Sequence, residues 1–292
     1  HLQGITVLND GKSFFDFKPS EKLSNTMNTF MPNYSGSENH MIMASHVERM
    51  KMSNCYVNSG KMSCITCHNP HVSVKFTPQQ QYINACNSCH GNKNTCTEKL
   101  EIRNTKQNNC ITCHQDKNGR IDIPHVAVTD HFIRKKPLLE NRDEVAKFIS
   151  MICYNNDKLD ARTRARAFLE FYERYEPANI FLDSARMYLQ KSGVNMDKDA
   201  DYDLIRIFFL QEKYEQLISL VQNKKPSDFT DAWTAYRIGE SYLSTKNSAQ
   251  AIAYLQQAVR LKKYALDFQN KLGKAYLLSK NLPEAQKVFQ FI

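Results

Sequence analysis

The pattern Cys-x-x-Cys-His occurs three times within a stretch of 51 residues. The copies are CITCH at 64–68, CNSCH at 86–90 and CITCH again at 110–114. Their first cysteines are 22 and 24 residues apart, and each second cysteine is followed at once by a histidine. Any fold for this region must therefore present three similar sites close together in one small domain.

The spacing within each copy suits the covalent attachment of a haem. Two thiols three residues apart on one turn can form thioethers with the two vinyl groups of a haem, and the next residue then offers an imidazole to the iron. The sequence therefore predicts three haems c. The predicted attachment and proximal-ligand residues are Cys64, Cys67 and His68; Cys86, Cys89 and His90; and Cys110, Cys113 and His114.

Other uses of paired cysteines explain the pattern less well. Structural zinc pairs CxxC knuckles two by two, which leaves one of three unused, and it needs no histidine after each second cysteine. A thioredoxin-like redox motif would lie in a βαβ pattern, which is absent here. A disulfide framework would not explain the histidines.

Few long apolar segments occur between residues 40 and 132, where Asn, Lys, Ser and Thr are frequent. A domain of this composition buries little surface through its side chains. We therefore expect three apolar macrocycles, held near one another by the short motif spacing, to form much of its core.

Six-coordinate haems need a second axial ligand for each iron, and six histidines lie outside the motifs. His71 follows a proximal ligand too closely to reach the same iron, so a neighbouring haem is its predicted target. The predicted distal ligands are His46, His71, His125 and His131. His40, the terminal His1 and a Met thioether from residues 41, 43, 50, 52 or 62 remain alternatives, with packing favoured for the methionines.

Three cysteines remain outside the motifs. Because haem is attached outside the cytoplasm, where disulfides persist, a Cys55–Cys96 disulfide is the favoured interpretation. Cys153 lies in the apolar run FISMICY and is expected to be a buried free thiol.

The texture changes near residue 143, after which apolar residues recur at helical spacing. A period of 34 residues repeats Gly239 and Tyr242 as Gly273 and Tyr276, and Ala251-x3-Leu255 as Ala285-x3-Phe289. This is the tetratricopeptide pattern of paired helices. One period earlier the repeat is degenerate, and 160–191 is expected to form a further helix pair. Arg162, Arg164 and Arg166 are expected on a solvated helix face.

The segment SHVERMKMSNCYVNSGKMSCITCHNPH, followed by CNSCH, NNCITCH and IPHVAVTDHFIRKKP, resembles multihaem c-type cytochromes that carry C-terminal tetratricopeptide repeats. The resemblance covers about residues 40–137 and the helical tail. It implies a periplasmic or surface-exposed electron-transfer protein with mainly bis-His haems. It also supports His46, Cys55, His71, Cys96, His125 and His131 as motif positions. Relatives usually carry further CxxCH motifs upstream, and this chain has none before Cys64.

These observations predict a mainly α chain: a loop-rich multihaem cytochrome domain at 1–137, then a tetratricopeptide-type solenoid at 143–292. We expect an electron carrier rather than an enzyme, with the repeats docking redox proteins or cytochrome subunits. A reductase with an open haem site and a haem-bearing scaffold subunit are the alternatives. A net charge of +9 without a basic, aromatic-rich run does not favour nucleic acid. No apolar run could span a membrane. We expect an exported, periplasmic or extracellular protein, with no signal peptide in this chain.

Overall fold

The structure is a computed structural model that describes residues 4–35, 46–91, 96–119, 127–135 and 147–292. Most of the described chain is helical, which confirms the prediction of a mainly α protein. Residues group into two compact units. The first comprises residues 1–5 and 29–155, and the second comprises 6–28 and 156–292. This grouping does not test the assignment of a cytochrome domain and a repeat domain, which stays a prediction.

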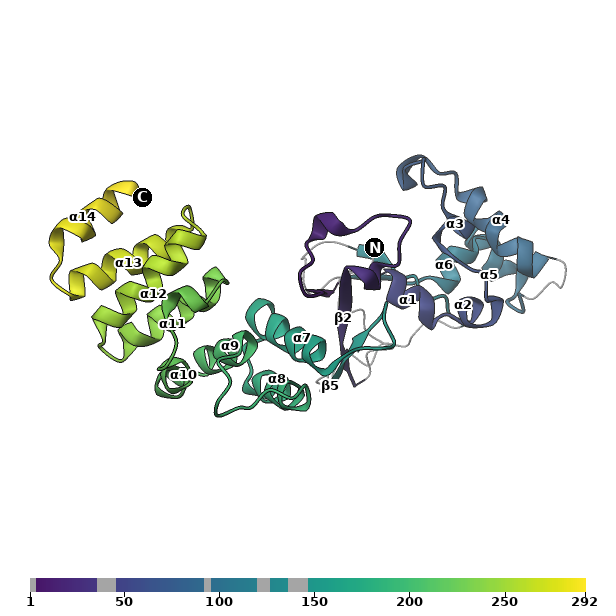
Figure 1. Cartoon of the computed structure of the whole chain (residues 1–292). Helices are drawn as coiled ribbons and strands as arrows, with labels where there is room; N and C mark the ends of the chain where they lie inside the picture. The colour runs from purple at the N-terminus through teal and green to yellow at the C-terminus, as the bar shows by residue number, and fades with distance from the viewer. Residues whose placement is uncertain (1–3, 36–45, 92–95, 120–126, 136–146) are drawn as a thin grey trace. The chain divides into compact units, whose positions relative to one another are not determined.

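The first unit contains short helices separated by loops (Figure 1). Two 3-10 turns, Phe14–Asp16 and Leu23–Asn25, belong to the second unit, and a third, Val74–Phe76, belongs to the first. The helices of the first unit are α1 (His46–Met52), α2 (Asn54–Ser59), α3 (Cys64–Cys67), α4 (Gln79–His90), α5 (Leu100–Thr105) and α6 (Cys110–His114). Helix α4 contacts both α3 and α6, so the three helices that carry the CxxCH motifs are neighbours.

The described chain also contains strands, which the sequence did not predict. Strands β1 (Ile5–Leu8), β2 (Met27–Tyr34) and β5 (Phe148–Cys153) form a sheet in the order β1-β2-β5. Strand β2 pairs antiparallel with β5, with Phe30 opposite Cys153. Residues 148–153 were expected to begin the helical half, and that expectation is wrong. Apolar periodicity in a short run cannot separate helix from strand, and here the partner strand lies more than 100 residues upstream.

A second, smaller ladder precedes the segment that carries His131. Strands β3 (Lys117–Gly119) and β4 (Ala127–Thr129) pair antiparallel, with Lys117 opposite Thr129. The ladder begins three residues after His114 and ends two residues before His131. It therefore brings the end of the third motif close to residues 130–134.

The second unit is built from successive helix pairs (Figure 1). Each helix contacts its partner, and the pairs also contact one another. The helices are α7 (Ala161–Arg174), α8 (Asn179–Lys191), α9 (Tyr202–Leu210), α10 (Tyr214–Val221), α11 (Ala232–Ser244), α12 (Ser248–Leu261), α13 (Leu266–Leu278) and α14 (Leu282–Phe291), with a 3-10 turn at Pro226–Asp228. Their inward faces supply most of the buried apolar side chains of the described chain.

The 34-residue period has a geometric counterpart in the second unit. Glu212, Lys246 and Lys280 all adopt the left-handed conformation, with φ between 57° and 62°, at 34-residue intervals. In each case the next N–H donates to a carbonyl five residues earlier, at 2.8–2.9 Å. The earliest of the three turns lies in the repeat that appeared degenerate from its side chains. The repeat therefore extends through the backbone of α9 and α10.

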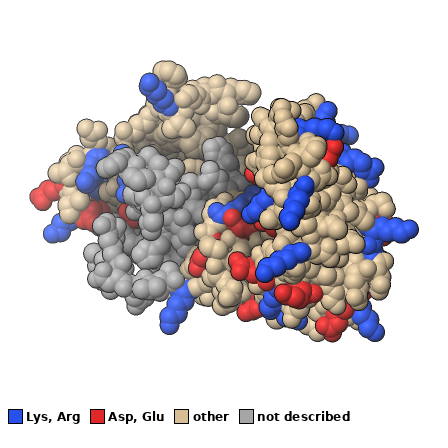
Figure 2. Space-filling view, turned by 90° about the vertical axis from the view of Figure 1, so that its left-hand side faces the viewer, with Lys and Arg blue, Asp and Glu red and all other residues tan. Residues whose placement is uncertain are grey.

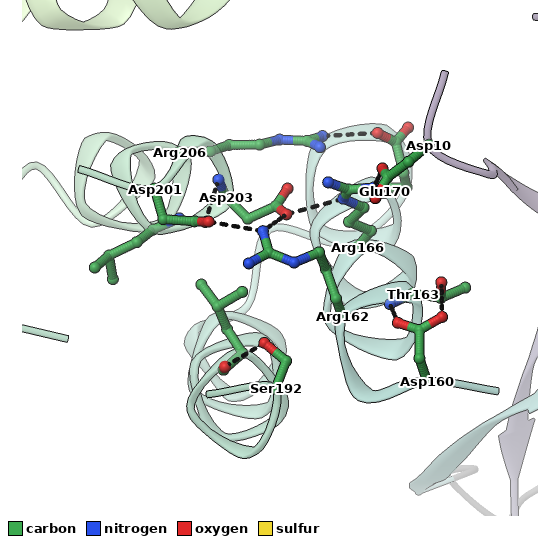
Figure 3. A network of polar contacts seen from close by, with 12 residues as sticks. Asp10, Asp160, Arg162, Thr163, Arg166, Glu170, Ser192, Asp201, Asp203 and Arg206 are labelled. Atoms are coloured by element: carbon green, nitrogen blue, oxygen red, sulfur yellow. Dashed lines mark hydrogen bonds and ion pairs between the residues drawn. The ribbon is translucent and has the colours of Figure 1, made fainter. Parts of the chain in front are cut away.

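Two arginines of α7, Arg162 and Arg166, pair with acidic side chains, so the expectation of a solvated helix face is wrong for these two. Arg162 lies 2.7 Å from Asp201 and 3.1 Å from Asp203, and Arg166 lies 2.8 Å from Asp203 and also pairs with Asp10 (Figure 3). Asp201 is also the N-cap of α9. The i, i+4 spacing of the two arginines puts them on one face, and that face is turned towards α9 rather than water.

Candidate haem-binding site

Each CxxCH motif lies on a helical turn. The first forms α3, the second ends α4, and the third forms α6. Residues at i, i+3 and i+4 share one face of a helix. At the end of α4 and in α6 the two thiols and the imidazole therefore lie on the same side. In the first motif the two thiols share a face, and His68 follows as the C-cap of α3 with extended backbone. Local contacts fix the turns, since Ser63 and Thr66 form a capping box on α3 and the Asn109 side chain accepts from the N–H of Ile111 at 3.0 Å on α6.

The imidazole of His114 is oriented through its Nδ1 atom. This atom lies 2.7 Å from the carbonyl oxygen of Arg134, and the N–H of Arg134 donates back to the carbonyl of His114 at 3.0 Å. A carbonyl can only accept, so Nδ1 carries the proton and Nε2 is left with its lone pair. A backbone carbonyl holding the second nitrogen is the usual support of a metal-ligating histidine.

His131 is prepared for ligation in the same way. Its Nδ1 donates to the carbonyl of Thr129 at 3.1 Å, which leaves Nε2 as the acceptor. Burial lowers the pKa of His131, although the Thr129 carbonyl acts in the opposite direction. The neutral imidazole, which is the form that binds iron, is therefore favoured.

Three of the histidines predicted as ligands come together. The ring centres of His68 and His131 are 6.1 Å apart with planes 25° from parallel, and those of His46 and His131 are 4.2 Å apart. Tyr82 lies with its edge against His68, at 5.3 Å between ring centres. His71 and His90 are exposed, and His125, like His1 and His40, lies outside the described residues. The ligand roles of all these histidines stay predictions.

Cysteines from all three motifs also lie near one another. Burial raises the pKa of Cys86 to about 11, and the thiols of Cys110 and Cys67 add to the shift. Burial also raises the pKa of Cys67, with a contribution from Cys55. The side chains that would carry neighbouring haems therefore belong to one cluster.

The cysteines outside the motifs are separate thiols in this structure. Cys55 is half-buried and Cys96 is exposed, and neither forms a disulfide. The predicted Cys55–Cys96 bond stays a prediction. Cys153 is a free thiol, as expected, but it is half-buried in β5 rather than fully buried.

The packing of the motif helices fits a bound macrocycle. Helices α2 to α6 contain no fully buried side chain. Large apolar side chains are instead exposed in this region, including Ile65 at 71%, Val74 at 65% and Phe76 at 74%. Apolar side chains of this kind are stabilised when a flat apolar group covers them. The donor set and the packing therefore both fit haem.

A buried ion pair that the sequence analysis missed lies beside these histidines. Arg49 Nε lies 2.9 Å from Asp130 Oδ1, and Arg49 Nη2 lies 2.6 Å from Asp130 Oδ2. Both side chains are 1% exposed. Burial alone would raise the pKa of Asp130, but the hydrogen bonds from Arg49 and the N–H of Phe132 outweigh it and hold that pKa below its ordinary value. The sequence offered one indication of this pair: Arg49 follows His46 by three residues in SHVER, and Asp130 directly precedes His131 in TDH.

Residues 56–95 match the family model described as a doubled CXXCH motif. This stretch contains the first two motifs, and the third lies beyond it. No curated protein matches the chain. The CXXCH motifs indicate covalent haem c binding, and the paired motif suggests a cytochrome c-type role in electron transfer. Among the residues that the structure describes, no helix is long and apolar enough to cross a membrane.

Proposed function

We propose that this chain is a multihaem electron-transfer protein that works in an exported compartment. Three covalently bound haems c, one at each motif, pass single electrons between redox proteins. Haem iron supplies the one-electron couple, and the protein tunes it through axial ligands, burial and hydrogen bonds. The observation that carries the proposal is the adjacency of the three motif turns, with thiols from all three in one cluster.

The geometry supports a specific axial pair for the first haem. A metal–imidazole bond is about 2 Å long and the ligating nitrogen lies about 1 Å from its ring centre, so two axial imidazoles have ring centres about 6 Å apart. His68 and His131 are 6.1 Å apart. His46 is too close to His131 to share an iron with it in this arrangement, which favours His46 as a ligand elsewhere.

The helical half has a supporting role in this proposal. Its helix pairs, with their 34-residue repeat of backbone turns and of close helix contacts, are consistent with tetratricopeptide-type repeats. Arrays of this kind present extended faces to other proteins. We infer that this half docks a redox partner or a cytochrome subunit. Figure 2 shows basic and acidic side chains interspersed on one face of the molecule.

Absorbance spectra of the purified protein test the proposal. We expect three haems per chain, all low-spin when oxidised and indifferent to carbon monoxide when reduced. The absence of haem bands would contradict the proposal and favour zinc. A high-spin component in the wild type would instead favour a reductase with an open iron.

Carbon monoxide binding also tests the axial pair. His131→Ala should open one iron, so that one equivalent of carbon monoxide binds and added imidazole restores the low-spin spectrum. If His131 faces His68, removing the first haem from the His131→Ala variant with Cys64→Ala and Cys67→Ala should abolish this binding of carbon monoxide. If carbon monoxide still binds without the first haem, His131 is the axial ligand of another iron. Tyr82→Phe, which removes only a hydroxyl beside His68, is the matched control and should remain low-spin.

A further inference from the structure

The ion pair between Arg49 and Asp130 joins two segments that both carry candidate haem ligands. Arg49 lies on α1, one turn after His46, and Asp130 directly precedes His131. The guanidinium contacts both carboxylate oxygens, at 2.9 and 2.6 Å. A two-point contact of this kind fixes direction as well as distance, because the planar fork of arginine matches the carboxylate.

Further hydrogen bonds hold the backbone of residues 131–133 beside this pair. Ser53, which is fully buried, donates through Oγ to the carbonyl of His131 at 3.1 Å and accepts from the N–H of Ile133 at 2.8 Å. The N–H of Phe132 donates to Asp130 at 2.9 Å. The backbone on either side of the His131 ring is therefore held to the end of α1 and to Asp130.

Further contacts continue from this segment to the third motif. Arg134 lies 3.6 Å from Asp130 and 3.7 Å from Asp116. Its guanidinium also lies 4.2 Å from the centre of the Phe132 ring, and its carbonyl holds the imidazole of His114. The cluster of Arg49, Asp130, Arg134 and Phe132 thus touches the supports of both His131 and His114.

Stability alone does not account for a pair of this kind. Well-packed apolar residues of similar volume often stabilise a core as well as a buried ion pair does. A buried ion pair instead fixes how two segments are aligned, because any shift of one segment along the other would leave a buried charge without its partner. Here the register in question is that of residues 129–134 against α1, which sets where the ring of His131 lies.

We propose that Arg49 and Asp130 are positioning residues that hold His131 opposite His68 and thereby keep the iron of the first haem six-coordinate. This inference rests on the proposed function and adds to it residues that no motif contains. Arg49 and Asp130 do not touch the iron. They act through the backbone of His131.

Carbon monoxide binding and the reduction potential of the first haem test the inference. In Asp130→Asn the haem count should stay at three, while the hold of His131 on its iron weakens by about 10- to 100-fold, as is typical when a residue supporting a metal ligand is lost. A high-spin, carbon monoxide-binding fraction should appear at one haem, with a shifted potential. The other two haems should stay low-spin. Arg49→Lys keeps the positive charge but loses the two-point contact of the guanidinium, and it should give a smaller high-spin, carbon monoxide-binding fraction than Asp130→Asn.

Asp203→Asn is the matched control. Asp203 is also largely buried, with its side chain 9% exposed, and it pairs with Arg162 and Arg166 in the second unit. Its loss should lower the unfolding temperature and leave the haem spectrum unchanged. If Asp203→Asn opened a haem to the same extent, the effect of Asp130→Asn would be general destabilisation and the inference would fail.

Arg49→Lys keeps the inference testable if Asp130→Asn does not accumulate, because it keeps the charge and loses the two-point contact. Ser53→Ala removes two hydrogen bonds from residues 131–133 and leaves the ion pair in place, so any open fraction should be smaller than in Asp130→Asn. A wild-type spectrum and potential in Arg49→Lys, or in Asp130→Asn where it folds, would overturn the inference. A wild-type protein that lacks haem or already binds carbon monoxide would instead contradict the proposed function.

Discussion

At the scale of single residues, one hydrogen bond decides which nitrogen of a histidine is offered to a metal. His114 and His131 both give their Nδ1 proton to a backbone carbonyl, those of Arg134 and Thr129. Both carbonyls belong to the same short stretch of chain, residues 129–134. This stretch therefore orients a proximal and a candidate distal ligand together.

A residue-scale prediction concerns the N-cap of α7. The Asp160 carboxylate accepts from the N–H and the hydroxyl of Thr163, both at 2.7 Å. Burial raises the pKa of Asp160, but these hydrogen bonds outweigh it and lower that pKa below its ordinary value. At pH 7, Asp160→Ala should cost about 1 kcal/mol of unfolding free energy, the usual cost of a lost cap. Chemical denaturation followed by circular dichroism measures it.

The pH dependence of the same cap has a definite sign. Because the folded-state pKa of Asp160 is lowered, its stabilisation is complete above the unfolded-state value of about 4 and is lost as the pH falls through the folded value. Asp160→Asn keeps a capping oxygen but cannot titrate. The stability gap between wild type and Asp160→Asn should therefore change only below about pH 4. A gap that changes between pH 5 and 8 would contradict this assignment.

Sequence reasoning succeeded at the residue scale where the signal was local. The CxxCH turns are contiguous, and helical turns are what the structure has at all three. It failed for Arg49 and Asp130, because these residues are 81 positions apart and only the folded structure shows that they form a buried ion pair. It failed likewise for Arg162 and Arg166, since an arginine on an exposed face and one paired with a distant aspartate look the same in a sequence.

At the scale of elements, the helix pairs repeat because of contacts between equivalent residues. A Cβ added at Gly239 would lie 2.7 Å from Cγ of Leu255, and one added at Gly273 would lie 2.5 Å from Cζ of Phe289. Each glycine thus permits the close approach of paired helices. This periodicity was visible in the sequence, whereas the pairing of β2 with β5 was not, because more than 100 residues separate the two strands and no turn signal joins them.

The two glycines are expected to respond differently to alanine. Leu255 is fully buried and its backbone N is also close to the added Cβ, so Gly239→Ala should overpack α11 against α12 and cost about 1–3 kcal/mol. Phe289 is 41% exposed on α14 and meets the new methyl only with its ring, which can turn away. Gly273→Ala should then be close to neutral, since alanine also favours the helix by up to about 1 kcal/mol.

Thermal and urea unfolding of both variants measure this difference. Equal losses of stability at the two positions would contradict this prediction. They would show that the distance between the paired helices, and not the mobility of the facing side chain, determines the cost of the added methyl. Leu255→Ala, which removes the Cγ and Cδ atoms that the added methyl would meet, should cost less in Gly239→Ala than in the wild type. It should not improve Gly273→Ala, which serves as the internal control.

At the scale of the whole chain, the two units differ in how they obtain a core. Helices α7 to α14 bury many apolar side chains against one another, including Leu169, Phe181, Ile205 and Phe268. Helices α2 to α6 bury none completely. Because burial of apolar surface is the main favourable term in folding, the second unit has its own source of stability and the motif helices need one from a cofactor.

This contrast predicts how the chain responds to the loss of haem. A variant with serine at all six motif cysteines should keep its second unit folded while helices α2 to α6 lose their structure. Hydrogen exchange followed by mass spectrometry should then show protected amides in 161–291 with and without haem, because α7 to α14 retain their packing. Amides in α2 to α6 should be protected only with haem, since fast exchange marks helices without a packed face. Equal protection of α2 to α6 in both forms would mean that side chains alone hold them, and the cofactor would then lose its structural role while keeping its redox one.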